Sequence, residues 1–174
     1  TLPEILNEYT LLTGRSALPT KQSLGYCAST MYYAELEKNC DEEIYKVIDK
    51  HEKEGILIDN FWLASGHSSG EKDNLRYVFN WNRDKFPDPK AFVQHYLDHG
   101  VKLCPNIKPC LLKDHPRFEE AKAEGLFVHD ADGTPSQVQF WDETGAYLDF
   151  TNPKTYGWWK ARVTDSLLEY GMAS

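Results

Sequence analysis

The stretch Asp88 to Ile107, DPKAFVQHYLDHGVKLCPNI, joins a helix to a strand through a single glycine. Asp88 followed by Pro89 is typical of a helix start, because aspartate caps free N–H groups and proline fits the first helical turn. Gly100 is placed to take the left-handed conformation that ends a helix. The apolar run over 101–107 predicts a strand buried on both faces.

The same arrangement recurs on both sides of this stretch. A helix is predicted over 41–54, followed by Gly55 and the apolar run 56–65. Another is predicted over 153–170, followed by Gly171 and a run that begins at Met172. Two more strands are expected over 23–29 and 146–150. Strands that alternate with helices indicate an α/β fold with a parallel sheet.

The length of the chain limits which α/β fold this is. A complete (β/α)8 barrel needs about 250 residues, and the chain has 174. Four strand–helix units and the first residues of a fifth strand predict a partial (β/α)8 TIM barrel. A flavodoxin-like open sheet is the alternative, and the lack of a glycine-rich phosphate loop after the first strand counts against it.

The connections between the predicted elements differ greatly in length. The turns from helix to strand are minimal, whereas long polar loops follow the second strand (66–86) and the third (108–145). We expect a hairpin at 77–81 and a small helix over 116–125 inside these loops. Loops at the carboxyl ends of the strands build the active sites of barrel enzymes, so the sequence predicts a site at one end of the fold.

Candidate site residues are those that follow the predicted strands. Aromatic rings suit the apolar faces of sugars, and charged or amide groups suit their hydroxyls, so this mixture favours a carbohydrate ligand. The alternatives are structural: a core position for Trp62, helix capping by Asp149, a solvated charge at Lys108 and loop packing by Trp141. The candidates for substrate binding are Tyr32, Tyr33, Trp62, Ser65, Asn106, Lys108, Trp141 and Asp149.

Composition excludes several classes of partner. The chain carries 19 Lys and Arg against 27 Asp and Glu, for a net charge of −8, which argues against nucleic acid. No apolar run approaches the roughly 18 residues that span a bilayer, and the N-terminus does not resemble a secretory signal.

The four cysteines form no CxxC pair, which predicts free thiols in a reduced, cytoplasmic compartment. The six histidines are scattered, so no metal or cofactor is expected.

Several phrases resemble glycoside hydrolase family 31, which contains α-glucosidases and α-xylosidases. They are LGYCASTMYY, FNWNRDKFPDPKAFVQHYLDHGVKLCPNIKP, AYLDFTNP followed by WW, and LLEYG. The resemblance runs from about residue 18 to 174. Residues 1–20, with YTLLTGRSALP, resemble the linker that leads from an N-terminal β-sandwich into the family's barrel. Residues 21–174 then correspond to the first half of the catalytic domain, cut at the start of the fifth strand.

The resemblance implies a retaining mechanism with two carboxylates, one a nucleophile and the other an acid/base. In the family the nucleophile is an aspartate near the end of the fifth strand. Here the matching position falls after Ser174, and the acid/base lies further on, so no residue of 1–174 matches either catalytic role. The resemblance gives Asp149, Trp141 and one of the tyrosines 32 and 33 a role in sugar binding.

The sequence departs from the family pattern at two strand ends. An acidic pair that often follows the second strand is replaced by the residues 63–66, LASG, which have no carboxylate. The common phrase Trp-Ile-Asn-Pro after the third strand reads Asn106-Ile107-Lys108-Pro109 here. Both changes alter the expected sugar-binding wall, and Lys108 is a candidate to replace lost hydrogen bonds.

Two interpretations follow. In the first, the chain is a segment of an α-glucosidase-like retaining glycosidase, inactive alone, whose partners are the carbohydrate substrate and the rest of the same polypeptide. In the second, it is a stand-alone half-barrel that dimerises or binds carbohydrate without catalysis. An unrelated small hydrolase is disfavoured, because no G-x-S-x-G turn is present.

Overall fold

A parallel three-stranded sheet forms the first half of the molecule. The computed structural model describes residues 1–172, except for the side chain of Thr30. Strands β1 (Cys27–Thr30), β2 (Asn60–Leu63) and β3 (Lys102–Pro105) lie in the order β1-β2-β3, all parallel. Neighbours in sequence are therefore neighbours in the sheet, as in a barrel wall and unlike the 2-1-3 order of a flavodoxin-like sheet.

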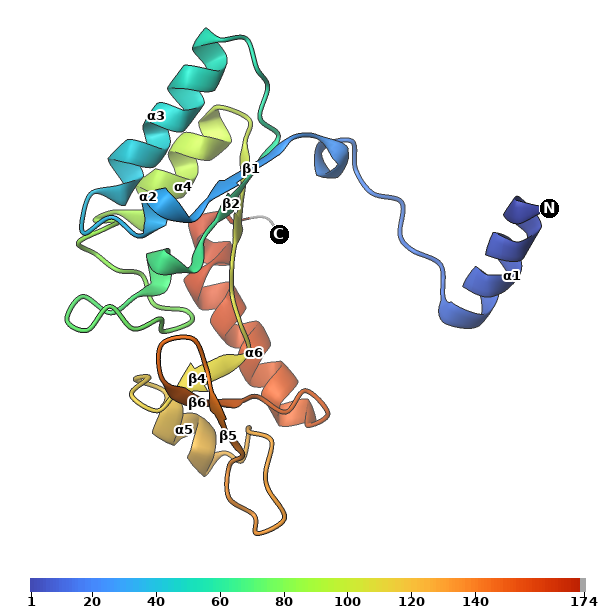
Figure 1. Cartoon of the computed structure of the whole chain (residues 1–174), viewed down its shortest axis with the longest axis vertical. Coiled ribbons are helices and arrows are strands. Elements are labelled where there is room, and N and C mark those ends of the chain that lie inside the picture. The colour runs from blue at the N-terminus through green and yellow to red at the C-terminus, as the bar shows by residue number, and fades with distance from the viewer. Residues whose placement is uncertain (173–174) are drawn as a thin grey trace.

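Two helices cover one face of this sheet, α3 (Cys40–Lys53) and α4 (Pro89–Asp98) (Figure 1). The predicted cap is confirmed, because the Asp88 side chain accepts a hydrogen bond from the Ala91 N–H at 3.0 Å. The glycines that end the predicted helices all have positive φ, as expected. Apolar side chains from both helices and all three strands form the first core, which includes Ala28, Ile44, Ile48, Phe61, Leu63, Phe92, Tyr96 and Leu103.

The strand predicted over 146–150 does not join the parallel sheet. Strand β6 (Thr144–Tyr147) instead pairs antiparallel with β4 (Cys110–Leu112) and β5 (Gln137–Gln139) in a separate sheet. The long loop after β3 supplies both partners, and Gly145 lies so close to β4 that a Cβ there would be 2.6 Å from the Leu111 carbonyl oxygen. The described residues therefore contain three parallel strands rather than four.

A second core packs on this antiparallel sheet. The helices α5 (Phe118–Ala123) and α6 (Pro153–Ser166) contribute to it, and α6 runs past both sheets (Figure 1). The predicted Asn152 cap of α6 is confirmed by its 3.0 Å bond from the Lys154 N–H. The second core consists of Val78, Leu111, Phe118, Ala121, Leu126, Phe127, Ala146, Leu148 and Trp158.

Residues 77–81 form a turn rather than the predicted hairpin. The Asn80 N–H donates to the Tyr77 carbonyl at 2.8 Å, and Phe79 takes a left-handed φ of 71°. This turn sends Val78 into the second core and Trp81 into the first, while Phe79 packs against both. No strand residues lie within 77–81, so the segment makes no hairpin and instead crosses from the second core to the first.

Other elements are shorter than predicted. The first strand begins at Cys27 rather than 23, because a 3-10 turn, η1 (Gln22–Leu24), precedes it and the Tyr26 N–H donates to the Asp59 carboxylate at 3.0 Å. The last helix ends at Ser166 and is followed by the turn η3 (Leu168–Tyr170). A fifth strand is expected to begin at Met172, and the rest of this prediction falls on residues 173–174, which lie outside the described residues.

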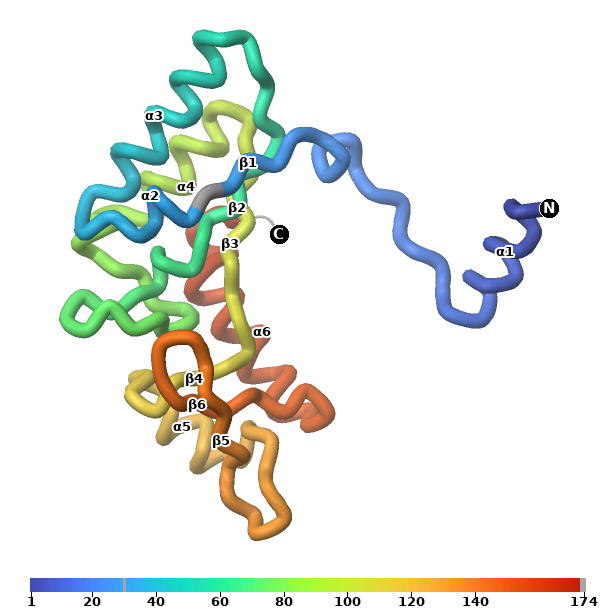
Figure 2. The backbone as a smooth tube through the Cα atoms, in the orientation of Figure 1, coloured from blue at the N-terminus to red at the C-terminus, as the bar shows by residue number. Residues whose placement is uncertain are grey.

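Helix α1 (Leu2–Thr13) lies away from both cores, at the end of an extended segment (Figure 2). None of its residues is buried. Its exposed apolar side chains recur at helical spacing: Leu2, Ile5, Leu6, Tyr9 and Leu12. Such a stripe is typical of a helix that packs against a partner surface.

A buried histidine supports the loop after β2. His67 lies in the turn η2 (Ser65–Ser68), is 1% exposed and packs beside Trp81. Its Nδ1 is 2.9 Å from the Ala64 carbonyl oxygen. Burial lowers the pKa of His67 from its ordinary 6.5 to about 4, so the ring is neutral in the folded protein at pH 7.

Substitution of Leu63 tests the first core. Leu63 is fully buried on β2, whereas Leu57, in the preceding turn, is 84% exposed. We expect Leu63→Ala to lower the free energy of unfolding by about 2–5 kcal/mol, because it leaves a cavity. Leu57→Ala, the control, should change it by less than about 0.5 kcal/mol. Equal losses in urea denaturation would contradict the assignment of this core.

Acid titration tests the buried His67. In the unfolded chain His67 becomes protonated below about pH 6.5, whereas in the folded chain it becomes protonated only below about pH 4. His67 therefore lowers stability by roughly 1.4 kcal/mol per pH unit as the pH falls through this window. We expect the acid-dependent loss to shrink in His67→Asn and to persist in the exposed control His129→Asn. An unchanged slope in His67→Asn would show that His67 titrates normally.

Candidate functional site

The carboxyl ends of β2 and β3 bring three of the predicted site residues together. Ser65 begins the turn η2 after β2, and Asn106 and Lys108 follow β3 directly. The Asn106 N–H donates to the Leu63 carbonyl at 2.9 Å, which continues the pairing of the two strands past their ends. Parallel strands end at the same edge of a sheet, so their following residues share one recess.

Lys108 is the charged centre of this group. Its Nζ donates to the Asn106 Oδ1 at 3.0 Å and lies 5.4 Å from the centre of the Trp141 ring. Burial, and then the nearby Arg76 guanidinium, lower the pKa of Lys108. The exposed Trp141 ring reaches Lys108 from the connection between β5 and β6. A cation held over an aromatic face is a favourable contact, so four predicted residues form one surface: Ser65, Asn106, Lys108 and Trp141.

Arg76 ties this surface to the rest of the fold. Its Nη1 bonds the Asp142 Oδ1 at 2.6 Å, its Nη2 bonds the Glu35 Oε1 at 2.7 Å, and its backbone N–H donates to the Asp142 Oδ2 at 3.0 Å. Burial opposes the charge, but the two carboxylates outweigh it and raise the pKa of Arg76. Sequence reasoning missed Arg76 and Glu35, because neither lies in a motif or at a strand end.

The recess between these groups is shallow. Ser65, Asn106, Lys108, Arg76 and Phe140 line it together with Ser68, Val78 and Cys110, and it holds about 20 Å³. That is room for about one water molecule. A sugar ring could therefore lie across the mouth of the recess against Trp141, but not inside it.

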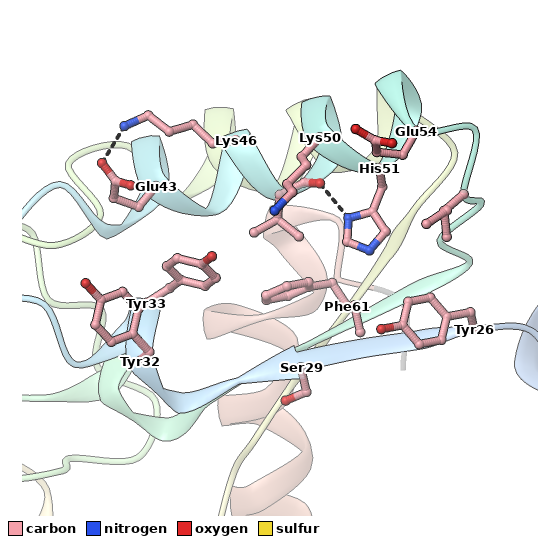
Figure 3. Close-up of a pocket in the computed structure, with 13 residues that line it drawn as sticks. Tyr26, Ser29, Tyr32, Tyr33, Glu43, Lys46, Lys50, His51, Glu54 and Phe61 are labelled. Carbon is pink, nitrogen blue, oxygen red and sulfur yellow. Dashed lines mark hydrogen bonds and ion pairs between the residues drawn. The ribbon is translucent and has the colours of Figure 1, made fainter.

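Tyr32 and Tyr33 line a different and larger hollow. Both lie on the short helix α2 (Met31–Ala34) after β1, with their rings edge to face at 5.3 Å between centres. The hollow holds about 640 Å³ between β1 and α3, and Figure 3 shows the two tyrosines below α3 with Lys46 and Glu43 above them. It lies along the outer edge of β1, which pairs with no strand among the described residues.

The remaining two predicted residues lie elsewhere. Trp62 points away from the first core, is 54% exposed, and lines an apolar hollow of about 330 Å³ with residues of β3 and η3. The Asp149 Oδ1 accepts bonds from the Thr151 hydroxyl at 2.6 Å and the Thr151 N–H at 2.9 Å, and these bonds lower the pKa of Asp149. The eight candidates thus fall into separate places, with four of them in one surface.

The described residues also bear on other kinds of site. Among residues 1–172, no group of three or more His, Cys, Asp and Glu side chains is arranged to hold a metal. Of the four cysteines, Cys40 and Cys110 are buried, Cys104 is half-buried and Cys27 is exposed. No helix within the same residues is long and apolar enough to cross a membrane.

Comparison with known proteins agrees with this geometry. The family model described as "Glycosyl hydrolases family 31 TIM-barrel domain" matches residues 16–174. Alpha-xylosidase XylQ of Lactiplantibacillus pentosus is 29% identical over 98% of the chain, and neutral alpha-glucosidase AB of Sus scrofa is 30% identical over 90%. A family 31 dextranase of Flavobacterium johnsoniae shares the fold at a TM-score of 0.84 and 24% identity over 97% of the chain and 20% of its own.

A second solved relative is the glucosidase II alpha subunit, with a TM-score of 0.75 and 28% identity over 88% of the chain and 16% of its own. The chain spans only 22% of the xylosidase and 16% of the glucosidase AB. The family model covers nearly the whole chain, and its TIM-barrel description agrees with the sequential parallel strands β1 to β3. The chain therefore belongs to glycoside hydrolase family 31.

Proposed function

We propose that the chain supplies part of the sugar-binding wall of a retaining α-glycosidase with α-glucosidase-like specificity. The observation that carries this proposal is the surface formed by Ser65, Asn106, Lys108 and Trp141 at the carboxyl ends of β2 and β3. Its support is chemical: the Trp141 ring matches the C–H face of a sugar, and Lys108 donates to hydroxyl oxygens. The names of two relatives, alpha-xylosidase XylQ and neutral alpha-glucosidase AB, support the same choice of substrate class.

The catalytic carboxylates are proposed to lie outside this chain, after Ser174. A retaining mechanism needs an acid with a raised pKa and a nucleophile on opposite sides of the scissile bond. Glu35 and Asp142 are bonded to Arg76, and the Thr151 bonds lower the pKa of Asp149. None of these three groups is suited to donate a proton to a leaving oxygen.

The rest of the same polypeptide is the proposed protein partner. The outer edges of β1 and β3 pair with no strand among the described residues. A hollow lined by both charged and aromatic side chains lies along β1, and residues of β3 line an apolar hollow. Unpaired edges and apolar faces need covering in a stable protein. We propose that later strands of the barrel cover them, and that a preceding β-sandwich covers the bare apolar face of α1 within the 1–20 linker.

The alternative function uses the same open edges differently. A stand-alone half-barrel would pair its β1 or β3 edge with a second copy, as two-fold dimers do. Sedimentation of the 174-residue chain tests this alternative, which predicts a compact dimer, and a clean monomer would count against it.

Activity measurements test whether the catalytic carboxylates lie outside this chain. We expect the 174-residue chain alone to hydrolyse no aryl α-glucoside and the longer polypeptide that contains it to do so, because both catalytic carboxylates are supplied from outside. Release of the aryl group is the readout. Equal activity of the two would overturn the proposal.

Substitutions in the longer polypeptide test the wall itself. Trp141→Ala and Lys108→Met should each raise KM for an aryl α-glucoside about tenfold, the loss of about 1.4 kcal/mol of sugar contact. Tyr156→Ala and Lys154→Met are the matched controls, since both side chains are exposed at the start of α6, outside this surface. If the controls raise KM as much as the wall variants do, the four-residue surface has no special role.

A further inference from the structure

We propose that Arg76 is a positioning residue that holds Trp141 in place at the sugar-binding surface, acting through Asp142. The inference rests on the proposed function of Trp141 and adds what fixes its position. Trp141 is 70% exposed, so packing around its ring constrains it little. Its neighbour in sequence, Asp142, is instead held by an ion pair with Arg76.

The bonds of Asp142 restrict its orientation. The Arg76 side chain engages one carboxylate oxygen at 2.6 Å, and the Arg76 backbone N–H engages the other at 3.0 Å. Two bonds from one residue to both oxygens fix the plane of the carboxylate as well as its distance. The turn around Asp142 is closed by a bond from the Phe140 N–H to the Glu143 carbonyl at 3.0 Å. Trp141 is therefore set between two fixed points.

Arg76 is itself anchored on the parallel sheet's side of the molecule. Its Nη2 bonds Glu35, directly after α2, at 2.7 Å. Arg76 and Asp142 side chains are 17% and 15% exposed, and Glu35 is 30% exposed. Partly buried pairs of this kind are screened less by salt than surface pairs. The guanidinium thus joins segments 41 and 66 residues away from it in sequence.

The geometry of a guanidinium suits this role better than that of an ammonium. Arg76 uses two different nitrogens for two carboxylates that come from opposite segments. A lysine offers one point charge on a flexible stem and does not hold both partners in fixed directions. Arg76→Lys should therefore restore the position of Trp141 only in part, while Arg76→Met should release it.

The test labels the tryptophans of the longer polypeptide with 5-fluorotryptophan and follows the fluorine resonance of Trp141. Trp141→Phe assigns that resonance. We expect it to shift in Arg76→Met and Asp142→Asn, to shift less in Arg76→Lys, and to stay unchanged in Arg117→Met, which breaks an exposed ion pair on α5. KM for an aryl α-glucoside should rise about tenfold in Arg76→Met with kcat within about twofold.

Double substitution sharpens the result. Because Arg76 and Asp142 act as one unit, the KM of Arg76→Met with Asp142→Asn should be no higher than that of Arg76→Met alone. An unchanged Trp141 resonance in Arg76→Met would overturn the inference. A shifted resonance with an unchanged KM would leave Arg76 in its positioning role but overturn the part of the proposed function that gives Trp141 a sugar contact.

Discussion

The parallel pairing of β1, β2 and β3 is the constraint on which the rest of the structure depends. β2 and β3 each follow a helix that ends at a glycine with positive φ, Gly55 and Gly100, whereas β1 follows the 3-10 turn η1. Parallel pairing puts all three exits at the same edge. The residues that follow β2 and β3 therefore lie close together as a direct result of strand pairing. For this reason Ser65, Asn106 and Lys108 line the same recess.

The long loops build a second layer on that edge. The loop after β3 folds back as an antiparallel sheet with its own core, and Phe79 packs against both cores. This layer carries Trp141, and Arg76 connects it to the helix after β1. The surface that we assign to sugar binding therefore lies where the parallel sheet and the antiparallel sheet, each with its own core, meet. Trp141 is exposed there, and the ion pair between Arg76 and its neighbour Asp142 is what we propose holds it in place.

Local signals in the sequence predicted much of this structure. The caps at Asp88 and Asn152, the helix-ending glycines and the three parallel strands depend on neighbouring residues, so patterns reveal them. The antiparallel pairing of β6 was missed because its partners β4 and β5 lie within 108–145, which was expected to be a loop, and because apolar patterning does not specify strand direction. The placement of Tyr32 and Trp62 in separate hollows and the bonds of Arg76 to two carboxylates are likewise non-local. The sugar-binding roles of all eight candidate residues remain predictions.

A crystal structure of the longer polypeptide with a bound α-gluco-oligosaccharide tests the central claim most directly. The account predicts a sugar ring packed on the face of Trp141, with a hydroxyl within about 3.2 Å of the Lys108 Nζ or the Asn106 side chain. An oligosaccharide bound in the catalytic cleft without contact to Trp141, Lys108 or Asn106 would contradict it.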